Sequence, residues 1–209
     1  MPKPTFDNLD PAKAERFLAI ALEEFADHDY AAASVTRIVA RAGIAKGSVY
    51  QYFDDKQDLF LHLLDVSAAR LMSVVSEAPP TTGDVFDQLR WQMSQTAVAA
   101  FRFPVHARLV ERAHTGELPF SGAVLDRARA LRASHFRELV RRGQSDGQLN
   151  PSLDPDLAAL TMDAVTSRLG ELLTGRLGHD VDWAGHPEVE RVFDQAVAVL
   201  RHGVAAAPD

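Results

Sequence analysis

The stretch from Lys46 to Tyr52 gathers side chains that can recognise a nucleic acid. Lys46 supplies a cation, while Ser48 and Gln51 each donate and accept hydrogen bonds. Tyr50 and Tyr52 add hydroxyls that suit phosphate oxygens and rings that suit thymine methyl groups. If the stretch is a helix, both tyrosines face outward, which is a poor use of aromatic surface against water. The residue types therefore predict a face that contacts a partner.

A helix and a glycine turn in front of this stretch would position it. Ser34 is a suitable N-cap for that helix. Apolar residues then recur at helical spacing, at Val35, Ile38, Val39 and Ala42. Gly43 stands where a helix end needs a left-handed residue, and Ile44 can fold back onto that end. Helix, glycine turn and second helix fit the helix-turn-helix pattern.

The second helix is expected from about Ala45 to Phe53, with Val49 and Phe53 facing inward. The residues left outside are Lys46, Gly47, Ser48, Tyr50, Gln51 and Tyr52. Gly47 is unfavourable inside a helix, but it suits a backbone that must approach another surface closely. Lys56 lies in the first turn of the next helix, where it adds to the positive end of the helix dipole. That end is expected to attract a DNA phosphate.

The run AGIAKGSVYQYFDDKQDLF, residues 42–60, resembles the signature of the TetR (tetracycline-repressor) family of bacterial regulators, usually close to AGVSKGTLYxYFxxKxxLF. The resemblance is specific over residues 13–64 and architectural beyond them. It implies DNA contacts from Ser34, Thr36, Arg37, Lys46, Gly47, Ser48, Tyr50, Gln51, Tyr52 and Lys56. The first three would meet the DNA backbone, the tyrosines and Lys56 would hold phosphates, and the others would face bases or nearby phosphates. Ala45 departs from the family pattern, which usually has Ser or Thr there, so a weaker N-cap is expected.

The rest of the chain favours helices and gives almost no strand signal. Asp10 followed by Pro11 opens a helix before the motif, and a helix from about Asp55 to Val75 follows the motif. Further helices are expected near residues 83–101, 104–115, 121–143, 155–177 and 187–205. We therefore predict an all-α fold. Residues 1–56 would form an N-terminal three-helix helix-turn-helix DNA-binding domain, and residues 57–209 a C-terminal helical bundle for ligand binding and dimerisation.

The C-terminal bundle is expected to hold a small-molecule effector, because helix bundles bind ligands between facing helices. Candidate lining residues, chosen by helical spacing, are Trp91, Gln95, Val98, Arg108, Phe136, Met162, Thr166 and Leu169. Their character favours a largely apolar effector, and Arg108 could meet an acidic group. For each of them, ordinary core packing or a solvated charge is the alternative.

The last two helices carry more apolar residues than a small bundle requires. These residues are Leu157, Leu160, Val165, Leu169, Leu172, Val189, Val192, Phe193, Val197 and Leu200. The resemblance implies that both helices pair with a second copy as a four-helix interface; the alternative is that these faces are all internal. A twofold homodimer would set two recognition helices roughly 34–36 Å apart, or a multiple of that, on a palindromic operator of double-stranded DNA. The predicted function is therefore a sequence-specific regulator, a repressor that its effector releases from the operator.

Charge is distributed unevenly along the chain. The 209 residues include 22 Lys and Arg against 29 Asp and Glu, which gives a formal net charge of −7. The motif nevertheless has a local excess of positive charge, which comes from Arg37, Arg41, Lys46 and Lys56. A basic tip on an acidic body favours a specific footprint over indiscriminate coating of nucleic acid. The structural alternative is a helical hairpin whose charges are merely solvated.

Other chemistries lack their residues. The chain has no cysteine, which excludes disulfides and thiolate sites. Its eight histidines form no H-E-x-x-H motif, so neither a metal nor a cofactor is expected. Apolar runs fall short of the roughly 20 residues that cross a bilayer, and the first residues lack the apolar core of a signal peptide. A cytoplasmic protein without membrane contact is expected.

A hydrolase is a rival class, because Gly143 to Gly147 match the G-x-S-x-G pattern of a nucleophile elbow. That elbow needs a strand before the serine and a helix after it, whereas here a helix comes first. A helix that ends at Gly143 explains the match better, so no catalytic residue is predicted. A helical adaptor without DNA or ligand is the third class, but it would leave the outward tyrosines without a role.

Overall fold

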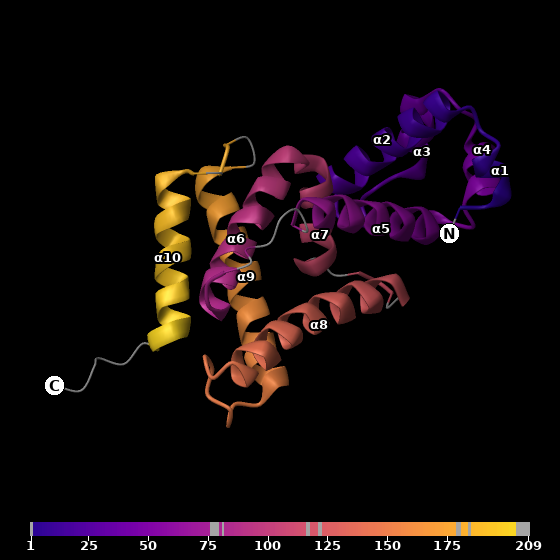
Figure 1. Cartoon of the computed structure of the whole chain (residues 1–209). Helices are drawn as coiled ribbons and strands as arrows, with labels where there is room; N and C mark the ends of the chain where they lie inside the picture. The colour runs from indigo at the N-terminus through magenta and orange to yellow at the C-terminus, as the bar shows by residue number, and fades with distance from the viewer. Residues whose placement is uncertain are drawn as a thin grey trace. The chain divides into compact units, whose positions relative to one another are not determined.

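The computed structural model describes residues 2–75, 80, 82–115, 118–120, 123–178, 181–183 and 185–203. Within these residues the chain forms helices and connecting loops, with no strand. The helices are α1 (Pro4–Asp7), α2 (Pro11–Asp27), α3 (Val35–Ala42), α4 (Lys46–Tyr52), α5 (Lys56–Val75), α6 (Val85–Arg102), α7 (Pro104–Thr115), α8 (Ala123–Ser145), α9 (Pro155–Leu177) and α10 (Pro187–His202) (Figure 1). The predicted all-α fold is confirmed. The sequence did not predict α1, because a helix this short shows no periodic pattern.

The helix ends of the motif are set by local caps that the sequence predicted. The Asp10 carboxylate accepts a hydrogen bond from the amide of Lys13 at 3.1 Å, at the start of α2. The Ser34 hydroxyl accepts one from the amide of Arg37 at 3.4 Å, at the start of α3. Gly43 ends α3 with a φ of 71°, the left-handed conformation that glycine adopts at little steric cost.

Residues 1–71 and 103–126 form one compact unit, and residues 72–102 and 127–209 form another. The first unit contains the helix-turn-helix, and α2, α3, α4, α5 and α7 all contribute to its core. Side chains that are at most 1% exposed in this core include Phe17, Ile38, Val49, Phe53, Leu59 and Leu109. Residue 57, where the sequence placed the domain boundary, lies inside α5.

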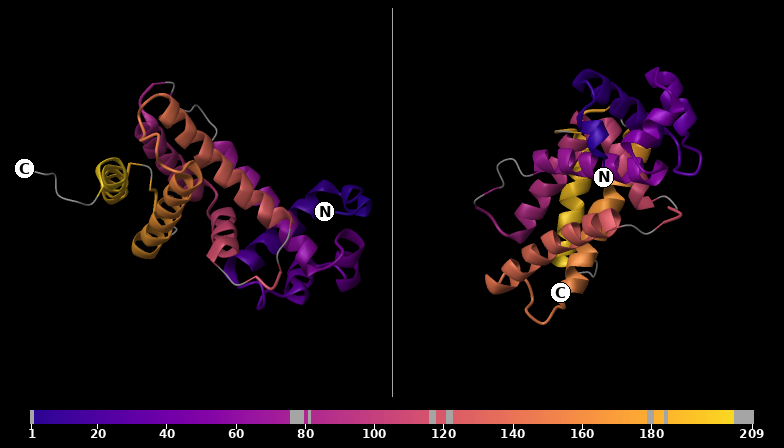
Figure 2. Two further views of the ribbon diagram at one scale, coloured as in Figure 1. Left: turned by 90° about the horizontal axis from the view of Figure 1, so that it is seen from below. Right: turned by 90° about the vertical axis from the view of Figure 1, so that its right-hand side faces the viewer.

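In the second unit, α10 packs against both α6 and α9. The helices α9 and α10, orange and yellow, lie side by side in Figures 1 and 2. The core of this unit includes Leu89, Met93, Phe136, Leu173 and Phe193. Arg90 on α6 links this helix to α10, because it donates hydrogen bonds to Asp194 at 2.7 Å and to Glu190, both on α10.

The end of α8 differs from the prediction. The helix continues to Ser145, and Gly143 lies inside it, buried. A Cβ at Gly143 would come 2.9 Å from the Leu149 side chain, so this glycine permits close packing. The left-handed residue is Gly147, with a φ of 70°, while the amides of Gln148 and Leu149 return to the Gly143 carbonyl at 2.8 and 2.9 Å. The predicted end was wrong because the sequence does not distinguish a packing glycine from a capping one.

Candidate nucleic-acid interface

The helix α4 has an open outer face. Its inward residue Val49 is fully buried, whereas Lys46, Gly47 and Gln51 are exposed and Tyr50 is 45% exposed. No described atom lies within 4 Å of the position that a Cβ on Gly47 would take, apart from the helix's own nearby backbone and chain neighbours. A partner can therefore approach the backbone of α4 closely at this point.

Two residues of α4 are less open than the sequence indicated. Ser48 and Tyr52 are both half-buried. The Tyr52 ring packs edge-on against Phe6 and Phe17, with centroid distances of 5.6 and 6.3 Å. The expectation of two outward tyrosines is therefore wrong for Tyr52, because Phe6 on the unpredicted α1 covers part of its ring. A phosphate contact from the Tyr52 hydroxyl remains a prediction.

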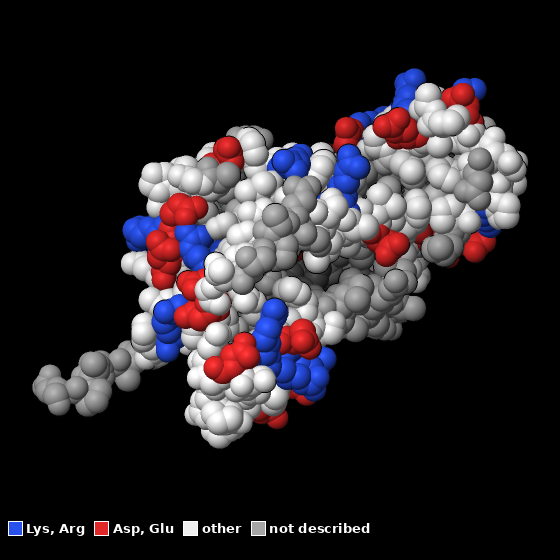
Figure 3. Space-filling view, in the orientation of Figure 1, with Lys and Arg blue, Asp and Glu red and all other residues white. Residues whose placement is uncertain are grey.

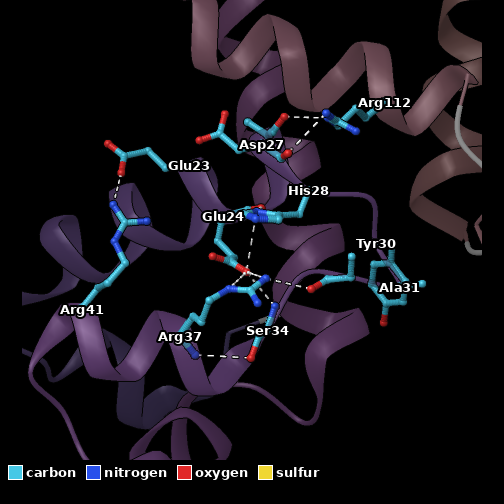
Figure 4. A network of polar contacts seen from close by, with 12 residues as sticks. Glu23, Glu24, Asp27, His28, Tyr30, Ala31, Ser34, Arg37, Arg41 and Arg112 are labelled. Carbon is cyan, nitrogen blue, oxygen red and sulfur yellow. Dashed lines mark hydrogen bonds and ion pairs between the residues drawn. The ribbon is translucent and has the colours of Figure 1, made fainter.

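Arg37 belongs to an internal network that joins α2 to α3 (Figure 4). Its Nε and Nη2 atoms donate to Glu24 Oε1 at 2.9 and 2.6 Å, and Nη2 also donates to the Ala32 carbonyl at 2.8 Å. The same Glu24 oxygen accepts the Ser34 amide at 2.8 Å. Glu24 is only 2% exposed. The guanidinium of Arg37 thus neutralises a buried carboxylate and fixes the start of α3. The neighbouring residue Thr36 is exposed.

The electrostatics of Glu24 follow from this network. Burial raises the pKa of the carboxyl group, but the hydrogen bonds from Arg37 and the Ser34 amide, with the charges of Arg37 and His28, outweigh it. The net result is a pKa below the ordinary value of 4.5. Glu24 therefore stays ionised at neutral pH and holds its partners.

Lys56 fastens α5 to the loop between α2 and α3. Its Nζ donates to the carbonyl of Tyr30 and, at 3.5 Å, to that of Ala31. It also lies 4.4 Å from the centroid of the Tyr30 ring. Burial lowers the pKa of Lys56; the charge of Glu24 opposes this effect and that of Arg37 adds to it. This lysine has a role within the subunit, and its contact with a phosphate remains a prediction.

Most cations of the basic tip expected from the sequence are engaged within the subunit, by an ion pair or by backbone carbonyls. Arg37 pairs with Glu24, Arg41 pairs with Glu23, and Lys56 binds carbonyls. Of the four cations in the motif, Lys46 alone has a side chain without a hydrogen bond or ion pair to another described residue. On the face drawn in Figure 3, positive and negative side chains are interspersed over the molecule. The local charge excess was overestimated because it ignored acidic partners on α2.

The candidate ligand residues fall into different places. Arg108 lies in the first unit, where its Nη2 donates to Asp27 Oδ1 at 3.1 Å. The other seven lie in the second unit. Two of them, Phe136 and Met162, are 1% and 5% exposed within its core. The remaining five, all half-buried, are Trp91, Gln95, Val98, Thr166 and Leu169.

A cavity of about 360 Å³ lies in the first unit. It is lined by Phe25, His28, Asp29, Tyr30, Ala31, Phe60, Arg112 and Leu118, none of which the sequence singled out for a ligand. Arg112 donates to the Ala26 carbonyl and to Asp29 Oδ1, both at 2.6 Å, so its charge is already compensated. The sequence could not indicate this cavity, because its walls come from α2, α5, α7 and the loops beside them.

The hydrolase reading finds no support in the geometry. α8 precedes Ser145, and a turn at Gly147 follows it, so the strand and helix of a nucleophile elbow are missing there. Within the described parts of the chain, no three His, Cys, Asp or Glu side chains are grouped so that they could hold a metal ion. None of the described helices has the length and apolar character needed to span a membrane.

Comparison with known proteins agrees with this motif and fold. Residues 17–63 match the model of the bacterial regulatory proteins of the tetR family. A crystal structure of a TetR family transcriptional regulator from Chloroflexus aurantiacus J-10-FL is 34% identical, with a TM-score of 0.81, and the match covers 97% of this chain and 98% of that one. The chain therefore belongs to the TetR family. It is a transcriptional regulator of the DNA-binding helix-turn-helix type and not an enzyme.

Two further likenesses are narrower. The HTH-type transcriptional repressor AcnR of Corynebacterium glutamicum is 43% identical over 53 residues, which are 25% of this chain and 28% of AcnR. The match thus spans little more than a quarter of this curated relative. Bacillus subtilis FadR, solved in complex with stearoyl-CoA, has a TM-score of 0.71 over 91% of this chain and 99% of FadR. At 16% identity, this likeness shows the fold alone.

Glu24 is a functional residue that the sequence reasoning missed. It follows Phe17 and Ala21 at helical spacing, on the buried face of α2. An acidic residue in that register needs a buried cation or amide as partner. This register was the available signal, because it indicates that a cation such as Arg37 is engaged by Glu24 within the subunit.

Proposed function

We propose that this chain is the subunit of a homodimeric repressor that binds a palindromic operator through α4. The observation that carries the proposal is the open outer face of α4, whose opposite side packs into the core through the fully buried Val49. Lys46, Gly47, Tyr50 and Gln51 stand at the centre of the proposed contact, since they are the exposed residues of this helix. In the proposal, Arg37 and Lys56 act mainly by holding the motif together.

An exposed apolar stripe supports a second copy of the chain as partner. On α9, Leu157, Leu160 and Leu172 are 64%, 63% and 42% exposed, and Val199 on α10 is 47% exposed. Exposed leucines in one stripe of a helix are typical of an interface. By contrast, Val189, Val192 and Phe193 of α10 are buried in their own subunit, so the proposed interface excludes them.

For the effector we propose a small, largely apolar molecule bound in the body of the subunit. The apolar character of the predicted lining residues supports it, as does FadR, in which the same fold accommodates stearoyl-CoA. Binding of this kind typically changes the affinity at a second site by 1–3 kcal/mol, which is enough to release a moderately tight operator. Native mass spectrometry of protein purified from its own host should reveal a co-purified small molecule.

An electrophoretic mobility shift against the promoter region beside its own gene tests the DNA proposal. The dimer should select one palindromic site over competitor DNA, and its affinity should fall steeply with added salt. Failure to prefer any sequence would contradict the proposal. A rise in transcription on binding would instead make the protein an activator. Because a transcriptional regulator must reach the chromosome, the proposal places it in the cytoplasm.

Two substitutions on α4 test the placement of the contact. Lys46→Ala should weaken binding to all sequences and reduce the salt slope by about one, the value for one lost phosphate contact. Gln51→Ala should change the preference among operator variants with little change in slope. Lys13→Ala, at an exposed position on α2, is the control. If both α4 variants bind as the parent does, the contact lies elsewhere.

Charged substitutions on α9 test the proposed dimer interface. Leu157→Asp with Leu160→Asp should convert the dimer to a monomer in sedimentation velocity, because two carboxylates cannot be buried there without partners. Leu153→Asp is a matched control, since Leu153 is 48% exposed but precedes α9. A dimer that survives the double change would place the interface on another surface.

A further inference from the structure

The C-terminal end of α4 is closed by the first residues of the chain. Three successive carbonyls at this end accept hydrogen bonds from the segment of residues 2–8, which we call the N-terminal strap. The Tyr50 carbonyl accepts from Lys3 Nζ at 3.0 Å, the Gln51 carbonyl from the Thr5 hydroxyl, and the Tyr52 carbonyl from the Lys3 amide at 2.8 Å. These carbonyls are among those that an α-helix leaves without partners of its own.

Apart from the packing of Val49 into the core, the sequence of α4 itself contributes little to the stability of the helix. The helix has seven residues, and isolated helices shorter than about 12–15 residues are marginal in water. Ala45 gives it no side-chain cap, and Gly47 lowers its helix propensity. At its other end Phe53 is extended, with a φ of −131°, so the left-handed glycine cap that ends α3 is lacking here.

Charge and packing both hold the strap in place. The Lys3 ammonium lies 2.9 Å from Asp54 Oδ1 and at the negative end of the α4 dipole. The pKa of Asp54 lies below its ordinary value, because Lys3 donates a hydrogen bond to it and adds its charge. On the other side of the strap, the Phe6 ring contacts Tyr52 and Phe53, with centroid distances of 5.6 and 5.3 Å. α1 and α4 are in contact, and Figure 1 shows them next to each other in the part of the molecule that contains the N-terminus.

We propose that Lys3 and Thr5 are positioning residues for DNA recognition, which hold α4 folded and aligned through its last carbonyls. This inference rests on the proposed function of α4. Lys3 acts on the helix end and not on a DNA phosphate. Loss of the strap bonds leaves the core of the first unit intact, while the end of α4 frays and its recognition face loses its alignment.

Paired variants of the full chain test the two bonds. Lys3→Met removes the ammonium and Lys3→Arg keeps a cation, while Thr5→Val removes the hydroxyl and Thr5→Ser keeps it. Lys3→Met and Thr5→Val should each raise the operator Kd about tenfold, which corresponds to about 1.4 kcal/mol. The Arg and Ser variants should stay near the parent value. Lys13→Met, an exposed lysine on α2, should have no effect.

Two readouts separate positioning from other roles. The salt slope should be unchanged in Lys3→Met, whereas loss of a direct phosphate contact would reduce it by about one. Hydrogen exchange should become faster in a peptide that covers residues 46–53 and stay unchanged in one that covers residues 35–42. The exchange measurement needs no DNA, so it tests whether the strap keeps α4 folded even if the parent protein binds no operator. Unchanged exchange in residues 46–53, or a reduced salt slope, would overturn the inference.

Discussion

The two helices of the motif are stabilised in opposite ways. α3 carries its caps within its own sequence, Ser34 at one end and Gly43 at the other, and Arg37 anchors it to buried Glu24. α4 has no side-chain cap at its start and depends on the strap at its end. The difference shows how the fold fixes a recognition helix without covering it. Among the described residues, the contacts that stabilise α4 fall on its inner face and its last turn, so its outer face stays open.

The largest effect is expected where α3 is anchored. Glu24→Gln should lower the free energy of unfolding by about 2–3 kcal/mol, because the buried acceptor loses its charge while Arg37 and the Ser34 amide still require it. Glu23→Gln is the matched control, since its pair with Arg41 has both side chains nearly half exposed, and it should lose less than about 1 kcal/mol. Urea unfolding followed by circular dichroism measures both. Equal losses would mean that the Glu24 network does not anchor α3.

The glycine at the end of α3 comes next. Gly43→Ala should destabilise the protein by about 1–2 kcal/mol, because an L-residue is strained at a positive φ. A Cβ there would meet no atom within 4 Å, so the loss is purely conformational. Thermal unfolding of the variant measures it. Gly43→Asn provides the control, since Asn tolerates this conformation better and should recover part of the loss.

The glycine of α4 should behave in the opposite way. Gly47→Ala should stabilise the free protein by about 0.5–1 kcal/mol, because Gly47 is helical and its Cβ would enter open space. The same methyl group should weaken operator binding, because it stands where the backbone approaches DNA. Unfolding and mobility-shift measurements on one preparation test both the expected gain in stability and the expected loss of operator affinity. If the variant is more stable and binds the operator as the parent does, Gly47 does not lie at the contact with DNA.

The smallest effect is a dependence on pH. The pKa of Glu24 is lower in the folded chain than its ordinary value of 4.5. Its contribution to stability is therefore complete above pH 4.5 and is lost as the pH falls through the folded pKa. The stability difference between the parent and Glu24→Gln should narrow below pH 4.5, which unfolding curves at several pH values can show. A difference that stays constant through the acid range would rule out the pKa shift as its source.

Much of the fold could be predicted because its signals are local. Asp10, Ser34 and Gly43 act on residues three to five positions away, and the apolar spacing of α2 and α3 identifies their buried faces. The bounds of α9 and the order of the helices could be predicted for the same reason. The prediction failed at Gly143, where the same residue type serves packing and not a cap.

The family motif and its two helices are therefore determined by the sequence itself, because periodicity, caps and turn glycines are properties of neighbouring residues. Only the tertiary structure decides which charges remain available. Arg37, Arg41 and Lys56 meet partners 13, 18 and 26 positions earlier in the chain. In the strap, Thr5 lies 46 positions and Lys3 lies 47 positions before the residues whose carbonyls accept hydrogen bonds from their side chains. A hydrogen bond or ion pair over such separations depends on how helices pack, so the residues of the motif alone could not distinguish Lys46 from the cations that are engaged within the subunit.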